Sequence, residues 1–147
     1  MIPVPLGPGD IPEVMRIERL PGYEGFIGRF THEEHLEQLA SPDAHYMGVR
    51  GAEGLDGFVI LQEFREPTVL LRRIALSEPG GGKGSALFRA SVDWIFANTP
   101  AQAVKLHVAK ANDRARHIYS RDGFTIYSTD EIGDRMSVSR ETWTARP

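Results

Sequence analysis

Three consecutive glycines at residues 80–82 constrain the fold of this chain more than any other feature. They separate an apolar run ending at Ser77, which predicts a strand, from residues 82–98, whose apolar positions recur with helical spacing. A strand that turns directly into a helix leaves the amides of the first helical turn unpaired, and glycines let a ligand approach them closely. Residues 78–85 therefore predict an α/β fold with an anion-binding turn.

Several ligands would suit such a turn. A nucleotide-triphosphate loop needs glycine where Ser77 stands and serine or threonine where Gly84 stands, so its pattern is not met. A dinucleotide fingerprint needs its third glycine where Ser85 stands. From this segment alone, a plain connection without a ligand stays open beside these alternatives.

Size and charge narrow the class of protein. The 147 residues, of which 41% are hydrophobic, suffice for one core, so we expect a single domain over residues 1–147. A net charge of -3 provides no global basic field, and we expect neither nucleic acid nor a membrane as partner. The absence of cysteine excludes a thiolate metal site and a cysteine nucleophile. Without a leader or an apolar span, we expect a cytoplasmic protein.

The remaining pattern alternates strands and helices. Thr31 and Glu34 have the spacing of a capping box, which predicts a short helix with Leu36 and Leu39 facing inward. His32 and His35 could in principle bind a metal ion, but they are three residues apart, whereas the zinc-protease pattern places its histidines four residues apart. We therefore expect no metal and a polar first helical turn instead. The other expected elements are strands at 2–6, 44–50, 57–64, 68–77, 104–109, 124–127 and 136–140, and helices from Asp10 and from Asn112 to about Arg121.

A second motif lies in residues 106–124. There, Asn112, Ala115, Tyr119, Gly123 and Phe124 follow the pattern Asn-x-x-Ala-x-x-x-Tyr and then Gly-Phe. The segment resembles the second conserved block of the GNAT superfamily of N-acetyltransferases, and Gly82 and Gly84 match the first block, although Pro79 stands where Gln or Arg is common. Within the superfamily it is most similar to ribosomal-protein alanine N-acetyltransferases and unassigned relatives, which carry an acidic residue where this chain has His107.

The resemblance implies a fold and an activity. The fold would be a mixed, mostly antiparallel central sheet of six to seven strands with about four flanking helices and a splay between strands 4 and 5. The activity would be direct transfer of an acetyl group from acetyl-CoA, as co-substrate, to a primary amine of a peptide or small molecule. A non-catalytic acyl-CoA-binding sensor or assembly module is the alternative, and the sequence leaves open whether the chain is a monomer or a homodimer.

The resemblance also implies site residues. Tyr119 would protonate the departing thiolate, and His107, an imidazole with an ordinary pKa near 6.5, would take a proton from the amine. Each also has a structural reading, Tyr119 as a core ring and His107 as a solvated side chain on the sheet. The expected cofactor-binding residues are Ile74, Ala75 and Leu76 on the fourth strand, Gly80, Gly81, Gly82, Lys83, Gly84 and Ser85 in the turn, and Asn112 and Ala115 on the next helix.

Other charged residues stay unassigned by the sequence. Arg72 and Arg73 interrupt an apolar strand, where they could contact an acidic substrate group or pair across strands with Glu63. The acceptor itself is not revealed, and we expect its site on the loops 19–30 and 128–135. Four basic residues could either pair with the phosphorylated adenosine end of the coenzyme or be solvated surface charges: Lys83, Lys110, Arg114 and Arg116.

Overall fold

The computed structural model describes residues 1–23 and 29–147, and in these residues seven strands form one sheet in the order β1-β2-β3-β4-β5-β7-β6. Every neighbouring pair is antiparallel except β4 and β5, which are parallel. The strands are β1 (Val4–Pro5), β2 (His45–Gly51), β3 (Gly54–Gln62), β4 (Thr68–Leu76), β5 (Ala103–Ala109), β6 (Thr125–Thr129) and β7 (Gly133–Ser139).

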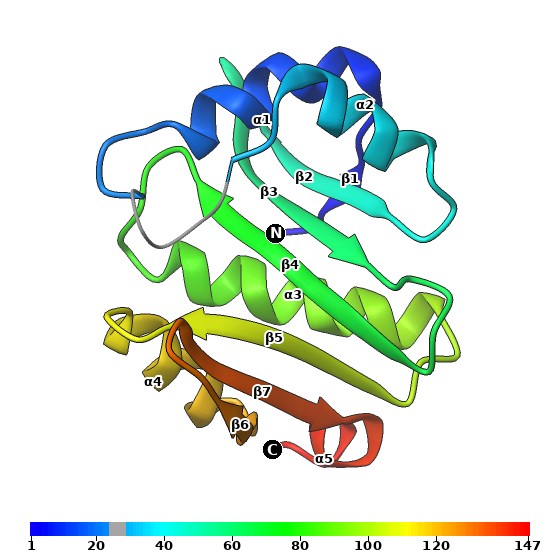
Figure 1. Ribbon diagram of the computed structural model, residues 1–147, viewed down its shortest axis with the longest axis vertical. Helices are drawn as coiled ribbons and strands as arrows, with labels where there is room; N and C mark the ends of the chain where they lie inside the picture. The colour runs from blue at the N-terminus through cyan, green and yellow to red at the C-terminus, as the bar shows by residue number, and fades with distance from the viewer. Residues whose placement is uncertain (24–28) are drawn as a thin grey trace.

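Helices cover both faces of this sheet (Figure 1). The apolar side of α1 (Ile11–Glu18) packs on β3 and β4 on one face, with α2 (His32–Ala40) beside it. On the other face, α3 (Lys83–Asn98) supplies much of the larger core, which α4 (Asp113–Arg121) and α5 (Arg140–Thr144) extend. A single 3-10 turn, Pro8–Asp10, precedes α1.

Local signals in the sequence account for several helix ends. The Thr31 side chain accepts a hydrogen bond from the Glu34 amide at 3.1 Å while the Glu34 carboxylate accepts one from the Thr31 amide at 2.9 Å, so the capping box is confirmed. Asn112 caps α4 by accepting from the Ala115 amide, and Gly123 follows α4 with a φ of 101°. Asp10 stands at the start of α1, but its carboxylate binds the Gly7 amide and the Arg50 guanidinium instead.

β4 and β5 diverge along their length. Only three residue pairs join them, ending at Leu70 and Lys105, and beyond this point the two strands separate, as Figure 1 shows. A bulge in β4 accompanies the divergence, because Arg73 pairs with Ile60 and Leu71 with Leu61, which leaves Arg72 without a partner in β3. The splay between strands 4 and 5 that the resemblance implied is therefore present.

The fold prediction is confirmed with small differences in the elements. Residues 136–140 were expected to be a strand, whereas the chain leaves β7 at Ser139 and begins α5 at Arg140. In the described part of the chain this gives five α-helices where about four were expected. No helix there is long and apolar enough to cross a membrane.

Candidate active site

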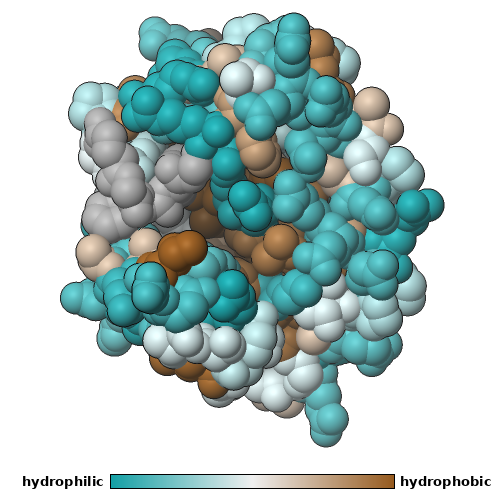
Figure 2. Space-filling view, viewed as in Figure 1, coloured by the Kyte–Doolittle hydropathy of each residue, from teal (hydrophilic) through white to brown (hydrophobic). Residues whose placement is uncertain are grey.

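A cavity of about 380 Å³ opens where β4 and β5 separate. Its walls come from the second half of β4, the end of β5, the glycine turn before α3, and one side of α4. Figure 2, in the same view as Figure 1, shows a hollow in the middle of this face, with hydrophobic residues at its floor and hydrophilic residues around it. The size falls in the range usual for small-molecule sites.

The cavity brings together residues that lie far apart in the sequence. Gly81 and Lys83 are not among the lining residues, although they belong to the same turn as residues that are. Eleven of the thirteen residues expected in the site line it: Ile74, Ala75, Leu76, Gly80, Gly82, Gly84, Ser85, His107, Asn112, Ala115 and Tyr119.

The glycine turn has a backbone that only glycine adopts easily. Gly80, Gly81 and Gly82 have φ angles of 113°, 64° and 77°, and a Cβ added at any of them would meet nothing within 4 Å. In the described residues, the amides of Gly84 and Ser85 donate to no protein group, and no side chain caps α3. A 16-residue helix therefore presents free N–H groups and the positive end of its dipole at the cavity.

The side of β4 that faces the gap has backbone groups without a partner strand. The Ser77 amide donates to the Asp56 carbonyl on the β3 side, so alternation along the strand turns Leu76 toward the gap and gives the backbone of Ala75 to β3. The Tyr23 hydroxyl lies at Leu76, where it donates to the carbonyl at 2.7 Å and accepts from the amide at 2.8 Å. Of the three residues expected on this strand, Ile74 and Leu76 therefore turn their backbone groups to the gap, whereas Ala75 turns its own to β3.

Tyr119 enters the cavity from α4. Its ring packs against Phe88 of α3, with ring centroids 4.6 Å apart, so the ring position is fixed by the core. Burial raises the pKa of Tyr119 to about 12. The hydroxyl forms no hydrogen bond with any of the described residues, which leaves its proton available to a ligand.

His107 lines the cavity from β5, on the sheet face that carries α1 and α2. Its Nε2 lies 3.5 Å from an Asp130 carboxylate oxygen, and the other oxygen of that carboxylate lies 2.6 Å from Arg135. Hydrogen bonds from the Gly133 and Ile132 amides and from Arg135 lower the pKa of Asp130 to about 2. An ionised carboxylate therefore stands beside the imidazole at all ordinary pH values.

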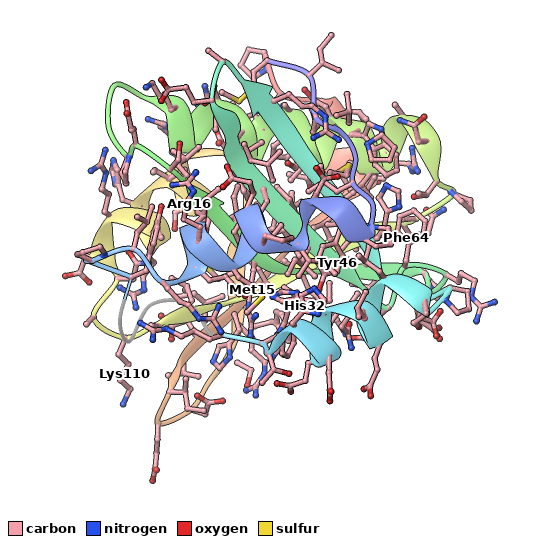
Figure 3. The ribbon with its side chains drawn as sticks, turned by 90° about the horizontal axis from the view of Figure 1, so that it is seen from above. Met15, Arg16, His32, Tyr46, Phe64 and Lys110 are labelled. Carbon is pink, nitrogen blue, oxygen red and sulfur yellow. The ribbon has the colours of Figure 1, made fainter. Side chains whose placement is uncertain are left out.

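A buried polar network holds the adjoining wall. The Arg73 guanidinium donates to Glu18 at 2.7 Å, and the second carboxylate oxygen of Glu18 binds His35 Nε2 at 2.9 Å. The other ring nitrogen of His35 lies 2.6 Å from the Tyr46 hydroxyl, and Figure 3 shows Tyr46 between α1 and α2. Arg73 also stacks on the Phe30 ring, 3.9 Å from its centroid. The network fixes α1, α2 and β4 to one another beside the cavity.

The structure excludes one interpretation that the sequence left open and corrects two of its expectations. Glu63 pairs with Lys105 at 3.0 Å, so neither Arg72 nor Arg73 uses it. His35, expected in a polar first turn, is fully buried, whereas Leu36, expected to face inward, is 38% exposed.

On α4, Arg116 binds Asp134, Asp113 and two backbone carbonyls. Of the four candidate cations, Arg114 is the one that lines the cavity. The described residues contain no cluster of three metal-ligating side chains.

Three residues near the cavity were not assigned from the sequence. Glu18 gave no signal, and Asp130 gave none beyond its place in the loop 128–135 that was expected to bind the acceptor, because an isolated acidic residue looks the same whether it is buried, paired or solvated. Tyr23 had a weak signal, as an aromatic residue in a loop rich in glycine and proline, although the segment 24–28 of that loop lies outside the described residues.

Comparisons with known proteins agree with this geometry. The model of the acetyltransferase (GNAT) family matches residues 12–124. A curated relative, the 5-NmdU N-acetyltransferase of Pseudomonas phage PaMx11, is 27% identical over 114 residues, which cover 76% of this chain and 80% of the relative.

Two solved structures share the fold at low identity. Spermidine N-acetyltransferase from Vibrio cholerae, in complex with CoA and spermine, has a TM-score of 0.81 at 19% identity over 97% of this chain and 96% of that one. AAC(6')-Ib, in complex with parmomycin and acetyl-CoA, has a TM-score of 0.79 at 17% identity over 98% and 96%.

Proposed function

This chain belongs to the acetyltransferase (GNAT) family and uses acetyl-CoA, and from that premise we propose that it acetylates a primary amine of a small molecule or peptide. One observation carries the proposal: free helix amides, a stretch of β4 without a partner strand and a tyrosine hydroxyl converge on one cavity. The names of the relative and of the two similar structures, which denote N-acetylation or show an amine-bearing ligand, support an amine as acceptor. A peptide amino terminus, as in the ribosomal-protein subgroup, belongs to the same chemical class.

The residues around the cavity fit the coenzyme. We propose that the Gly84 and Ser85 amides receive its pyrophosphate, since they are free and the three glycines before them carry no side chain that would fill the turn. Leu76 has the amide and carbonyl that an extended ligand would pair with, and the Tyr23 hydroxyl already uses both. Arg114, exposed at the same end of the cavity, is placed to pair with a further phosphate.

The chemistry requires one bond to form and one to break. Bound acetyl-CoA supplies a thioester, whose acetyl carbon bonds to the amine nitrogen as its bond to sulfur breaks. We propose that His107, with Asp130 behind it, takes the proton that the amine loses. Tyr119 donates its hydroxyl hydrogen to the sulfur as charge develops there. Its raised pKa keeps that hydrogen in place, so the donor is present across the working pH range.

Ligand binding and turnover test this function separately. CoA at about one hundred times its dissociation constant should stabilise the native state by about 2.7 kcal/mol, which corresponds to roughly 5–10 °C in melting temperature. Acetyl-CoA should then release thiol in the presence of a panel of primary amines. The absence of any shift with millimolar CoA contradicts the proposed cofactor site, and a shift without thiol release for any amine contradicts acetyl transfer.

The base is tested by replacing His107 with glutamine. The variant should bind CoA as the wild type does, because His107 lies on β5 away from the glycine turn, while turnover falls by about 100-fold. The loss of rate that imidazole protonation causes at acidic pH should also disappear from the rate profile. His117→Gln, on an exposed position of α4, is the matched control. If the loss of rate at acidic pH persists in His107→Gln, water or another group takes the proton of the amine.

A further inference from the structure

The charged residues that line the cavity all carry positive charge. Among the described residues that line it, the charged side chains are Arg72, Arg73 and Arg114, and neither aspartate nor glutamate is present. A site for a polyamine or another polycation needs carboxylates to neutralise its ligand, since burying uncompensated charge is costly. The lining therefore opposes a polycationic acceptor and favours one that carries negative charge.

Most basic side chains on β4, β5 and β7 near His107 form ion pairs, and Arg72 is the exception. Arg73 pairs with Glu18, Lys105 with Glu63 and Arg135 with Asp130. Arg72 forms no ion pair or hydrogen bond with any described residue, although it is exposed and lines the cavity. An exposed arginine is stable without a ligand, and what distinguishes Arg72 is its position beside a second guanidinium, that of Arg73, in a strand that is otherwise apolar.

The position of Arg72 separates it from the coenzyme phosphates. Leu70 pairs with Lys105, so two residues further along each strand Arg72 and His107 reach the same level of the cleft. Leu76 lies four residues beyond Arg72, roughly 13 Å along the strand, and the glycine turn lies beyond that. A group at Arg72 would thus be near the proposed base and far from the pyrophosphate amides, while Arg114 lies in the first turn of α4, which begins after β5 has ended.

From these observations we propose that the acceptor is an amine that also carries an acidic group, a carboxylate or a phosphate, which Arg72 binds while the amine lies at His107. The proposal rests on the proposed function and specifies its substrate class. Arg72 is a specificity-determining residue, and its guanidinium presents paired N–H donors that suit either anion. The bulge in β4 is what turns this side chain into the cleft instead of into either core.

Equilibrium binding to the CoA-loaded protein tests the proposal without turnover. The probes are O-phosphoethanolamine and β-alanine, which carry a phosphate and a carboxylate, with ethanolamine as their neutral counterpart and spermidine as a polycation. Titration calorimetry should show at least one acidic amine binding about tenfold more tightly than ethanolamine. The two acidic probes distinguish phosphate from carboxylate. Equal affinities, tighter spermidine, or no binding of either acidic amine at millimolar concentration overturns the proposal.

Substitutions assign the preference to one residue. Arg72→Gln should reduce the ratio of acidic to neutral affinity to near one, and Arg72→Glu should shift the preference to spermidine. Arg114→Gln, the matched control on the same cavity, should weaken CoA and leave the ratio as in the wild type. A ratio that persists in Arg72→Gln overturns the assignment. Thiol release is measured in parallel, so a binding preference without release refutes acetyl transfer but not the substrate class.

Discussion

Replacing Tyr119 with phenylalanine is expected to lower turnover about 100-fold while CoA affinity stays within about twofold of the wild type. The ring keeps its packing on Phe88, and the hydroxyl that is removed has no partner among the described residues. The free energy of unfolding should therefore change by less than about 0.5 kcal/mol. Pre-steady-state and steady-state thiol release measure the chemical step, and calorimetry measures CoA binding.

The control for this variant is Tyr127→Phe, because Tyr127 is 53% exposed and lies outside the cavity. The pH profile adds a second check. Because the pKa of Tyr119 is raised to about 12, the phenol stays protonated, and loss of its proton should cause no fall in rate below about pH 11. A variant that melts at a lower temperature and loses activity only in proportion to its folded fraction would assign Tyr119 a structural role.

Replacing Glu18 with glutamine is expected to destabilise the protein by about 3 kcal/mol, or roughly 6–12 °C in melting temperature. Glu18 is fully buried and accepts hydrogen bonds from Arg73 and Arg19 while binding His35, so its neutral analogue leaves the buried Arg73 guanidinium without a counter-charge. Chemical denaturation with and without CoA measures the effect. Glu37→Gln, exposed on α2, should change stability by less than about 0.5 kcal/mol.

A double variant separates charge from packing. Glu18→Leu with Arg73→Met removes both buried charges, and its stability should recover most of what Glu18→Gln loses. If the double variant is as unstable as the sum of the two single variants, the network does not act through the charge pair. The experiment also reports on the cavity, because Arg73 forms part of its wall.

Local chemistry made much of this fold predictable. The glycine turn, the Thr31 capping box and the Asn112 cap each depend on residues within a few positions of one another, so their sequence spacing predicts their geometry. The meander of β2, β3 and β4 follows from alternation and turn residues in the same way. The splay between β4 and β5 has no such signal and came only from the resemblance to a family.

The long-range contacts could not be predicted from the sequence pattern. Arg73 and Glu18 are 55 residues apart, and Tyr23 reaches Leu76 over 53 residues, so no spacing rule connects either pair. Arg73 is buried while Arg72 is exposed because of a bulge, which shifts the alternation of the strand by one residue. The sequence pattern did not reveal this bulge. Each of these features lies beside the candidate site, and functional sites are where proteins most often depart from local sequence–structure rules.

The separation of β4 from β5 changes how many free edges the sheet has. An open sheet has two, here β1 and β6, but this one gains two more inside the molecule, along the last residues of β4 and β5. A free edge is a template on which any extended chain can add, and in most proteins it invites aggregation. Here the inner edge of β4 lies in a cavity, and one hydroxyl, that of Tyr23, satisfies both backbone groups of Leu76. The opening that admits a coenzyme is thereby less able to admit a strand from another molecule.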